Sequence, residues 1–177
     1  MNGVIEKLGS YQLLTNLLPG AFFTIAMKYF WGMSLPTDNI VEEILVYYFI
    51  GLVVSRIGSL AIEPLLKKFK MIQYTAYPSY VNAVKADQKI DTLSEMNNYL
   101  RSLVTCVILL PLMKAFQVMA IHWAWFSLGW KWILLAALIL IFILSYRKHS
   151  SFIRNRVDIV NKLTDESKDA NGEKQEI

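Results

Sequence analysis

Charged residues and cysteine are both scarce in this chain. Of its 177 residues, 18% are charged and 55% are hydrophobic, and the mean hydropathy is +0.37. A soluble domain of this length needs much less apolar surface, so the balance argues against a soluble enzyme and against a disordered protein. Cys106 is the only cysteine. No intrachain disulfide can form, which excludes a secreted disulfide scaffold.

Signatures of catalysis and of metal binding are also missing. The sequence contains no nucleophile elbow and no phosphate-binding glycine loop. Its two histidines, His122 and His149, flank different apolar segments, and neither has a cysteine or a carboxylate at ligand spacing. We therefore expect a protein that is not an enzyme and that holds neither a metal nor another cofactor.

Long apolar blocks dominate what is present. A helix crosses the hydrocarbon of a membrane with about 20 mostly apolar residues, and four segments reach this length: residues 13–33, 44–66, 102–123 and 130–146. The N-terminal residues lack a basic region and a small-residue cleavage site, so we expect the first segment to be an uncleaved span. The predicted fold class is an all-α integral membrane protein. Four transmembrane helices would form a bundle over 1–149, with a helical cytoplasmic loop over 67–101 and a cytoplasmic helix and polar tail over 150–177.

Basic residues are distributed unevenly between the loops. The 34–43 loop is acidic and the 124–131 loop carries only Lys131, whereas the 67–101 loop and the start of the tail are rich in lysine and arginine. Positive flanks stay on the cytoplasmic side of a membrane. We therefore expect the 67–101 loop and both termini in the cytoplasm.

Capping signals predict where the cytoplasmic helices begin. Thr92 and Glu95 form a capping box, which would start a helix that continues into the third span. Ser79 would cap a second helix, and Ser150 or its neighbour would cap a separate amphipathic helix in the tail. The polar residues 164–177 are expected to be disordered when the protein is free.

Arg56 is the most informative single residue, because it lies near the middle of the second predicted span. A charge at this depth is costly unless it faces other helices or water. Glu63, seven residues later, would lie on the same helix face two turns away. Three interpretations remain open. Arg56 extends to lipid phosphate, or the two residues line an ion pathway, or Arg56 and Glu63 lock helices together in a polar network that Asn97, Asn98 or Arg101 could join.

Small residues follow one side of the same span. Gly51, Ser55 and Ser59 are spaced by four, and Gly58 lies beside them. Such a row lets the backbone of another helix approach closely. That helix could belong to the same chain or to a second copy in a homo-oligomer.

A basic and aromatic surface is predicted on the cytoplasmic side. Lysines follow the second span with tyrosines close behind, and polar residues precede the third span and open the tail. These positions fit the positive-inside signal, anionic lipid headgroups or a protein partner. They are Lys67, Lys68, Lys70, Tyr74, Tyr77, Asn97, Asn98, Arg101, Phe152, Arg154 and Arg156. The patch is too small and too close to the membrane to bind nucleic acid directly.

Two functions fit these features. A non-enzymatic, oligomeric membrane sensor or scaffold would bind a cytosolic protein through the helical loop and the tail. The alternative is a small oligomeric ion channel or membrane-perturbing effector. Arg56 motivates this alternative, together with Lys28 and Lys114 in the outer halves of their spans.

Two short stretches carry a resemblance to a known group of proteins: Arg56-Ile57-Gly58-Ser59 and Asn97-Asn98-Tyr99-Leu100-Arg101. With its size and its four predicted spans, the chain resembles the membrane component of Kiwa-type bacterial anti-phage defence systems. The resemblance implies an oligomeric sensor of phage attack in the bacterial inner membrane, which controls a cytosolic DNA-binding partner. It carries over no site residue.

Overall fold

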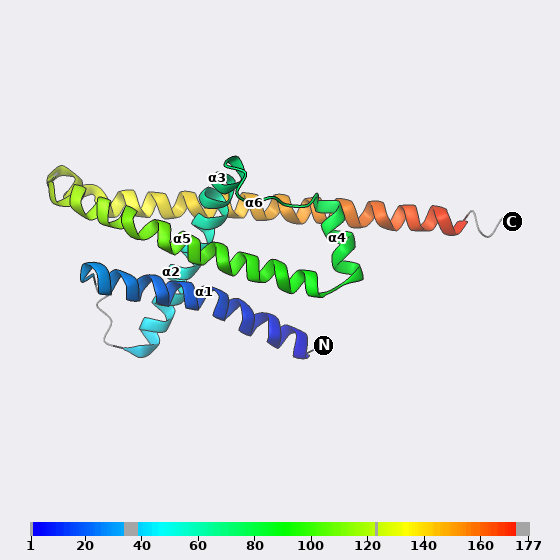
Figure 1. Ribbon diagram of the computed structural model, residues 1–177, viewed down its shortest axis with the longest axis horizontal. Helices are drawn as coiled ribbons and strands as arrows, with labels where there is room; N and C mark the ends of the chain where they lie inside the picture. Colours follow the sequence, from blue (N-terminus) through cyan, green and yellow to red (C-terminus); the bar gives the residue numbers. More distant parts are fainter. Residues whose placement is uncertain (1, 34–38, 123, 173–177) are drawn as a thin grey trace.

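The computed structural model describes residues 2–33, 39–122 and 124–172, with the side chains of 15–33, 39–119, 129 and 131–162. Nearly all of this part is helical, and no strand occurs in it (Figure 1). The elements in chain order are α1 (Asn2–Trp31), α2 (Ile40–Ile57), the π-helical turn η1 (Gly58–Ile62), α3 (Glu63–Lys68), α4 (Tyr77–Ala86), α5 (Lys89–His122) and α6 (Ala124–Gly172). The predicted all-α class is confirmed.

Three helical stretches in the described part of the chain are long and apolar enough to cross a membrane. They are Ile40–Lys68, Lys89–Met119 and Lys131–Lys162. The prediction of four such spans is therefore corrected to three. The segment 13–33 does form helix, as the later part of α1. Asn16, Pro19 and Lys28 interrupt its apolar residues, however, and lower its hydropathy.

α2, η1 and α3 form one continuous helical stretch with a wide turn inside it. Pro64 follows η1, and in a regular α-helix its ring would collide with the Leu60 carbonyl. The π turn relieves this collision, and the Glu63 amide bonds to the Gly58 carbonyl five residues back. The turn holds one residue more than an α-helical turn, so everything after it is rotated relative to a regular helix.

Short polar side chains set the starts of α2 and α5. Asn39 caps α2, because its side-chain oxygen accepts a hydrogen bond from the Val41 amide at 3.0 Å. Asp87 does the same for α5 by accepting from the Lys89 amide at 2.9 Å. The helix therefore begins before the capping box predicted at Thr92, and it then runs unbroken into the apolar stretch as predicted.

The starts of α4 and of the tail helix also differ from the prediction. α4 begins at Tyr77 with Pro78 in its first turn, where the missing proline amide needs no partner, rather than after Ser79. α6 continues past Ser150 to Gly172 without a break, because no proline or glycine interrupts the sequence there. The separate tail helix is thus wrong. Residues up to 172 of the tail expected to be disordered are helical, and residues 173–177 lie outside the described part.

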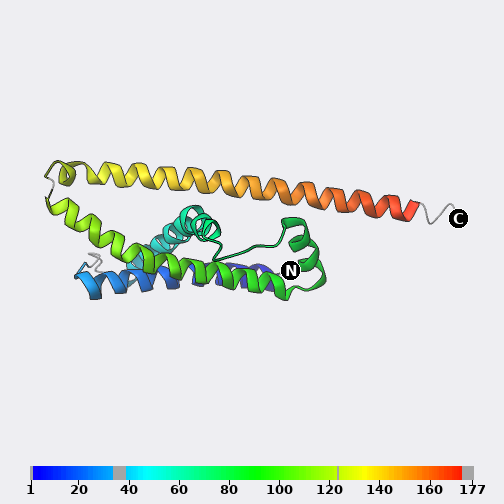
Figure 2. The ribbon, with the colours of Figure 1, turned by 45° about the horizontal axis from the view of Figure 1, so that its top comes forward.

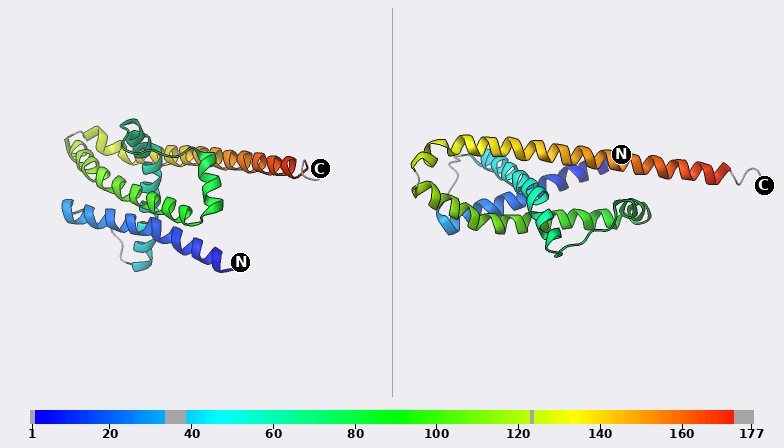
Figure 3. Two further views of the ribbon diagram at one scale, coloured as in Figure 1. Left: turned by 45° about the vertical axis from the view of Figure 1, so that its right-hand side comes forward. Right: turned by 90° about the horizontal axis from the view of Figure 1, so that it is seen from above.

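The helices form a long, open bundle (Figures 1, 2 and 3). α5 and α6 run antiparallel from the point where the chain turns between them, and α1 runs beside α5 in the same direction. α2 crosses the others obliquely and packs most extensively against α1. α6 extends far beyond the start of α5, so its last third stands clear of the bundle.

Two glycines mark the point where α1 and α2 touch. A Cβ at Gly51 would overlap the Asn16 carbonyl oxygen, and a Cβ at Gly20 would overlap the Tyr47 carbonyl oxygen. Glycine at both positions therefore lets one helix backbone rest on the other.

The apolar core of the described residues is small. Ala26, Met27 and Leu110 form its centre, and the buried Cys106 thiol donates to the Pro19 carbonyl at 3.4 Å. Most other large apolar side chains of α2, α5 and α6 are exposed, and 0% of the most apolar stretch of α6 is buried. Exposed apolar surface of this extent requires lipid or another protein around it.

Candidate functional site: a basic cavity between α3, α5 and α6

A cavity of about 860 Å³ lies where α3, α5 and α6 approach one another. Its lining comes from the end of α2 and the π turn, from α3, from the segment between α3 and α4, from the start of α4, from the first half of α5 and from the middle of α6. These segments are distant in sequence. The fold alone brings their polar side chains together.

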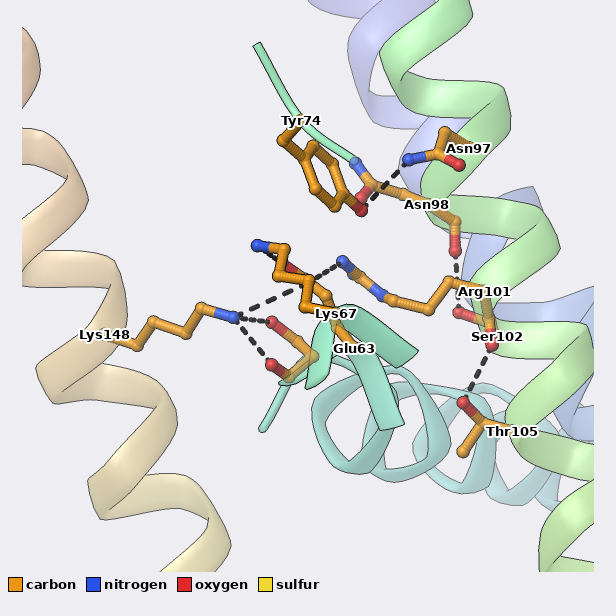
Figure 4. A network of polar contacts seen from close by, with 10 residues as sticks. Glu63, Lys67, Tyr74, Asn97, Asn98, Arg101, Ser102, Thr105 and Lys148 are labelled. Atoms are coloured by element: carbon orange, nitrogen blue, oxygen red, sulfur yellow. Dashed lines mark hydrogen bonds and ion pairs between the residues drawn. The ribbon is translucent and has the colours of Figure 1, made fainter. Parts of the chain in front are cut away.

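Glu63 is the centre of the ion pairs in this cavity (Figure 4). Its carboxylate accepts from Arg101 Nη1 of α5 at 2.6 Å and from Lys67 Nζ of α3 at 2.8 Å. Lys148 Nζ of α6 lies 3.7 Å from the same carboxylate. Glu63 is only 8% exposed, and a buried carboxylate is stable only with such partners. The ion pairs therefore tie α3, α5 and α6 together.

Lys148 also fixes α6 against the π turn. Its Nζ donates to the Ser59 carbonyl at 2.6 Å and to the Ser59 hydroxyl at 2.8 Å. In a regular helix the Ser59 carbonyl would accept from the Glu63 amide, but that amide bonds to Gly58. The next amide position is Pro64, which has no N–H. Lys148 thus supplies the donor that the π turn removes.

The same turn separates Arg56 from Glu63. Seven residues of regular helix would return Glu63 to the face of Arg56, but the extra residue of the π turn rotates it by about 100°. Both residues line the cavity, yet Glu63 pairs with Arg101. Arg56 is exposed and makes no hydrogen bond or ion pair with the described residues. The two residues thus line one cavity, but among the described contacts only Glu63 takes part in the ion pairs.

The cavity carries a strong excess of positive charge. Arg56, Lys67, Arg101 and Lys148 bring four cationic side chains to the lining. Glu63 is the sole carboxylate among the described lining residues. A concave site with an excess of positive charge attracts anions from solution or from a lipid surface.

One wall of the cavity is aromatic. Lys67 Nζ lies 4.1 Å from the centre of the Tyr74 ring, a cation–π distance. The Tyr74 hydroxyl accepts from Asn97 Nδ2 of α5 at 3.2 Å. The Tyr77 ring packs against Phe152 of α6 with 4.7 Å between centroids. The segment between α3 and α4 is therefore held against α5, and the start of α4 is held against α6.

The residues predicted to form a docking surface divide into two groups. Those that line the cavity are Lys67, Tyr74, Tyr77, Asn97, Asn98, Arg101 and Phe152. Those that are exposed outside it are Lys68, Lys70, Arg154 and Arg156. Sequence reasoning missed Ser145 and Lys148. Lys148 follows an apolar block directly, so the sequence indicates only a positive charge at the end of a span. No local pattern connects it to Ser59 in the π turn, 89 residues earlier.

The row of small residues makes its contacts within the chain. Gly51 meets α1, and a Cβ at Gly58 would come within 2.6 Å of Thr105 Oγ1 of α5. Ser59 accepts from Lys148 of α6, and Ser55 is half-buried. Three neighbouring helices thus use this side of α2 and η1.

Comparison with known proteins gives no relative. No protein-family profile matches the sequence, and no match is found among curated proteins or among solved structures. Within the described residues, no three His, Cys, Asp or Glu side chains lie together as a metal site would require. The chemistry of the cavity and the shape of α6 are therefore the basis for the function.

Proposed function

We propose that this chain is a non-enzymatic, oligomeric membrane sensor or scaffold that binds a cytosolic protein through the projecting end of α6. One observation carries this function. α6 has 49 residues, and a helix of that length extends about 74 Å at 1.5 Å per residue. The hydrocarbon of a bilayer is about 30 Å thick. More than half of α6 therefore lies outside the membrane as a rigid arm.

The surface of this arm suits a protein partner. Ile153 and Val157 are exposed, and their spacing of four places them on one helix face. Arg154 and Arg156 are exposed close by. An apolar strip with basic neighbours fits the groove or helix of an acidic protein.

Charge gives the orientation of the protein in the bilayer. Lysines and arginines gather in the 67–101 segment and at the end of the apolar part of α6, so the positive-inside rule places these parts in the cytoplasm. The three apolar stretches alone would leave the two chain ends on opposite sides, so both ends are cytoplasmic only if α1, which runs beside α5 in the same direction (Figure 1), also lies across the bilayer. From the resemblance to Kiwa-type membrane components we further propose that the membrane is the bacterial inner membrane and that the protein acts in anti-phage defence.

The exposed apolar face of α6 supports an oligomer. None of its most apolar stretch is buried within the chain, so lipid and a second copy are the two surfaces available to it. Packing between copies would cover part of this face and bring several arms together. Several arms in one assembly would bind a partner more tightly than one.

One observation favours the alternative, a small oligomeric channel. Arg56 lies deep in an apolar helix, is exposed and has no partner among the described residues. A cation in this position faces water or a neighbouring copy, and either arrangement would suit an ion pathway.

The test is the mass of the intact complex, purified from the native host in mild detergent. We expect a stoichiometric soluble protein that is lost when the chain is truncated after Phe152 and reduced in the double variant R154E/R156E. The double variant K85E/K89E makes the same charge change at exposed positions of α4 and α5 and should keep the partner. A homo-oligomer without a soluble protein, with ion conductance in liposomes that Arg56→Ala abolishes, would support the channel instead.

A further inference from the structure

Three buried hydrogen-bond donors in the basic cavity have no partner among the described residues. They are the Tyr77 hydroxyl, Arg101 Nε and the Ser145 hydroxyl, and all three residues line the same cavity. Ser145 is only 9% exposed. Buried donors are paired in the great majority of native structures. Three such donors lining one cavity would stabilise a group that accepts hydrogen bonds there.

The charges of the lining give the sign of that group. Glu63 is already engaged by Arg101 Nη1 and Lys67, which leaves Arg101 Nε and Arg56 without an anion. Lys148 donates two of its three N–H groups to Ser59. It lies 3.7 Å from the carboxylate, too long for a direct hydrogen bond to it, so its third N–H group is left for a ligand. An anion with several acceptor oxygens would satisfy these groups, and Arg with Lys is the combination that binds phosphate.

The size and walls of the cavity suit an anion that is part of a larger molecule. A volume of about 860 Å³ is in the range of sites for small organic ligands. Ile90, Leu93 and Phe152 contribute apolar surface, and Tyr74 and Tyr77 contribute rings. These walls suit the non-phosphate part of the ligand.

We propose that this cavity binds a phosphate-bearing molecule, with the phosphate held by Arg101 Nε, Ser145, Tyr77 and Lys148. The molecule comes either from the membrane, as the headgroup of an anionic phospholipid, or from solution. The site is independent of the partner proposed for α6, because it requires no second protein.

The test measures binding to the full-length chain in neutral detergent. Native mass spectrometry compares added phosphatidylglycerol with phosphatidylcholine, and equilibrium dialysis measures AMP and inorganic phosphate. One phosphatidylglycerol retained per chain in preference to phosphatidylcholine supports the site with a lipid source. Saturable binding of AMP or phosphate, without that lipid preference, supports it with a soluble source. If neither is bound saturably, the site does not exist.

Variants distinguish the cavity from general surface charge. The double variant Y77F/S145A removes two hydroxyls that bond to nothing in the described chain, so the fold should remain intact, as circular dichroism would verify. We expect affinity for the bound probe to fall about tenfold or more. K68Q/K70Q removes two positive charges outside the cavity and should change affinity less than about twofold. The reverse pattern, with binding lost only in K68Q/K70Q, would show surface attraction and overturn the site.

Discussion

The α1–α2 crossing and the basic cavity hold their helices together in opposite ways. At the crossing, Gly20 and Gly51 let two backbones touch. At the cavity, long charged side chains reach across a space of about 860 Å³ to join α3, α5 and α6. Backbone contact allows one geometry, whereas flexible side chains can rearrange around a ligand. The middle of α2 and the stretch that follows it therefore serve different purposes: the first fixes the bundle, and the second leaves room for binding.

The largest effect is expected at the crossing. Gly51→Ala would place a methyl group inside the Asn16 carbonyl, and the helices must separate to accept it. We expect a loss of about 3 kcal/mol or more in the free energy of unfolding, measured by thermal denaturation in detergent. Gly129→Ala is the matched control, since no atom lies within 4 Å of its Cβ position. The control should be neutral or stabilising by up to about 1 kcal/mol. Equal effects at both glycines would show that the crossing is not tight.

Removing the carboxylate of the cavity should have the next largest effect. Glu63→Gln breaks three ion pairs and leaves their cations facing one another. The expected loss is about 2–3 kcal/mol. This is below the value for a fully buried pair, because the Lys67 and Lys148 side chains are 45% and 47% exposed.

The same change should act in the opposite direction on ligand binding. Without Glu63 the cavity gains net positive charge, so the affinity of the full-length protein for phosphatidylglycerol or AMP should rise while stability falls. Glu42→Gln, at an exposed position in the first turn of α2, should change stability by no more than about 0.5 kcal/mol and leave affinity unchanged. Weaker ligand binding in Glu63→Gln would contradict the placement of the anion.

The π turn offers a third comparison, between two single-residue deletions. Deleting Ala61 together with Pro64→Ala converts η1 into regular helix and keeps the orientation of Glu63. We expect this variant to lose about 1 kcal/mol or less, since mainly the Ser59–Lys148 contact changes. Deleting Val53 instead rotates Glu63 by about 100° away from Arg101 and should be at least as harmful as Glu63→Gln. Similar stabilities for the two deletions would show that the π turn does not set the register.

Local signals predicted the helices well and their boundaries less well. Apolar length and spacing located the helical stretches, and a continuous helix into 102–123 was expected and is found in α5. The start of α5 was misplaced because Asp87 competes with Thr92 as a cap, and both are good capping residues. The first span was overestimated because its polar residues were counted as tolerable interruptions.

The cavity was beyond prediction for a different reason. Glu63 and Arg101 were predicted as possible members of one polar network, and the ion pair between them is found. The π turn before Glu63 was not foreseen, because a regular 3.6-residue period does not reveal it. Lys148 was overlooked, since its contact with Ser59 joins positions far apart in the chain. A signal was present in Pro64, which removes a backbone donor inside an apolar helix and so requires a substitute nearby.

The smallest effect is expected at the aromatic wall, where the contacts are partly in water. Tyr74→Leu removes the cation–π contact with Lys67 and the hydrogen bond from Asn97, and should cost about 0.5–1 kcal/mol. Tyr74→Phe keeps the ring over the ammonium group and should lose about half as much, measured by the same thermal denaturation. If both variants were as stable as the wild type, the segment between α3 and α4 would be held by Tyr77 and Phe152 rather than by Tyr74. The Tyr74 side chain would then be free to rearrange around a ligand, like the charged side chains of the cavity.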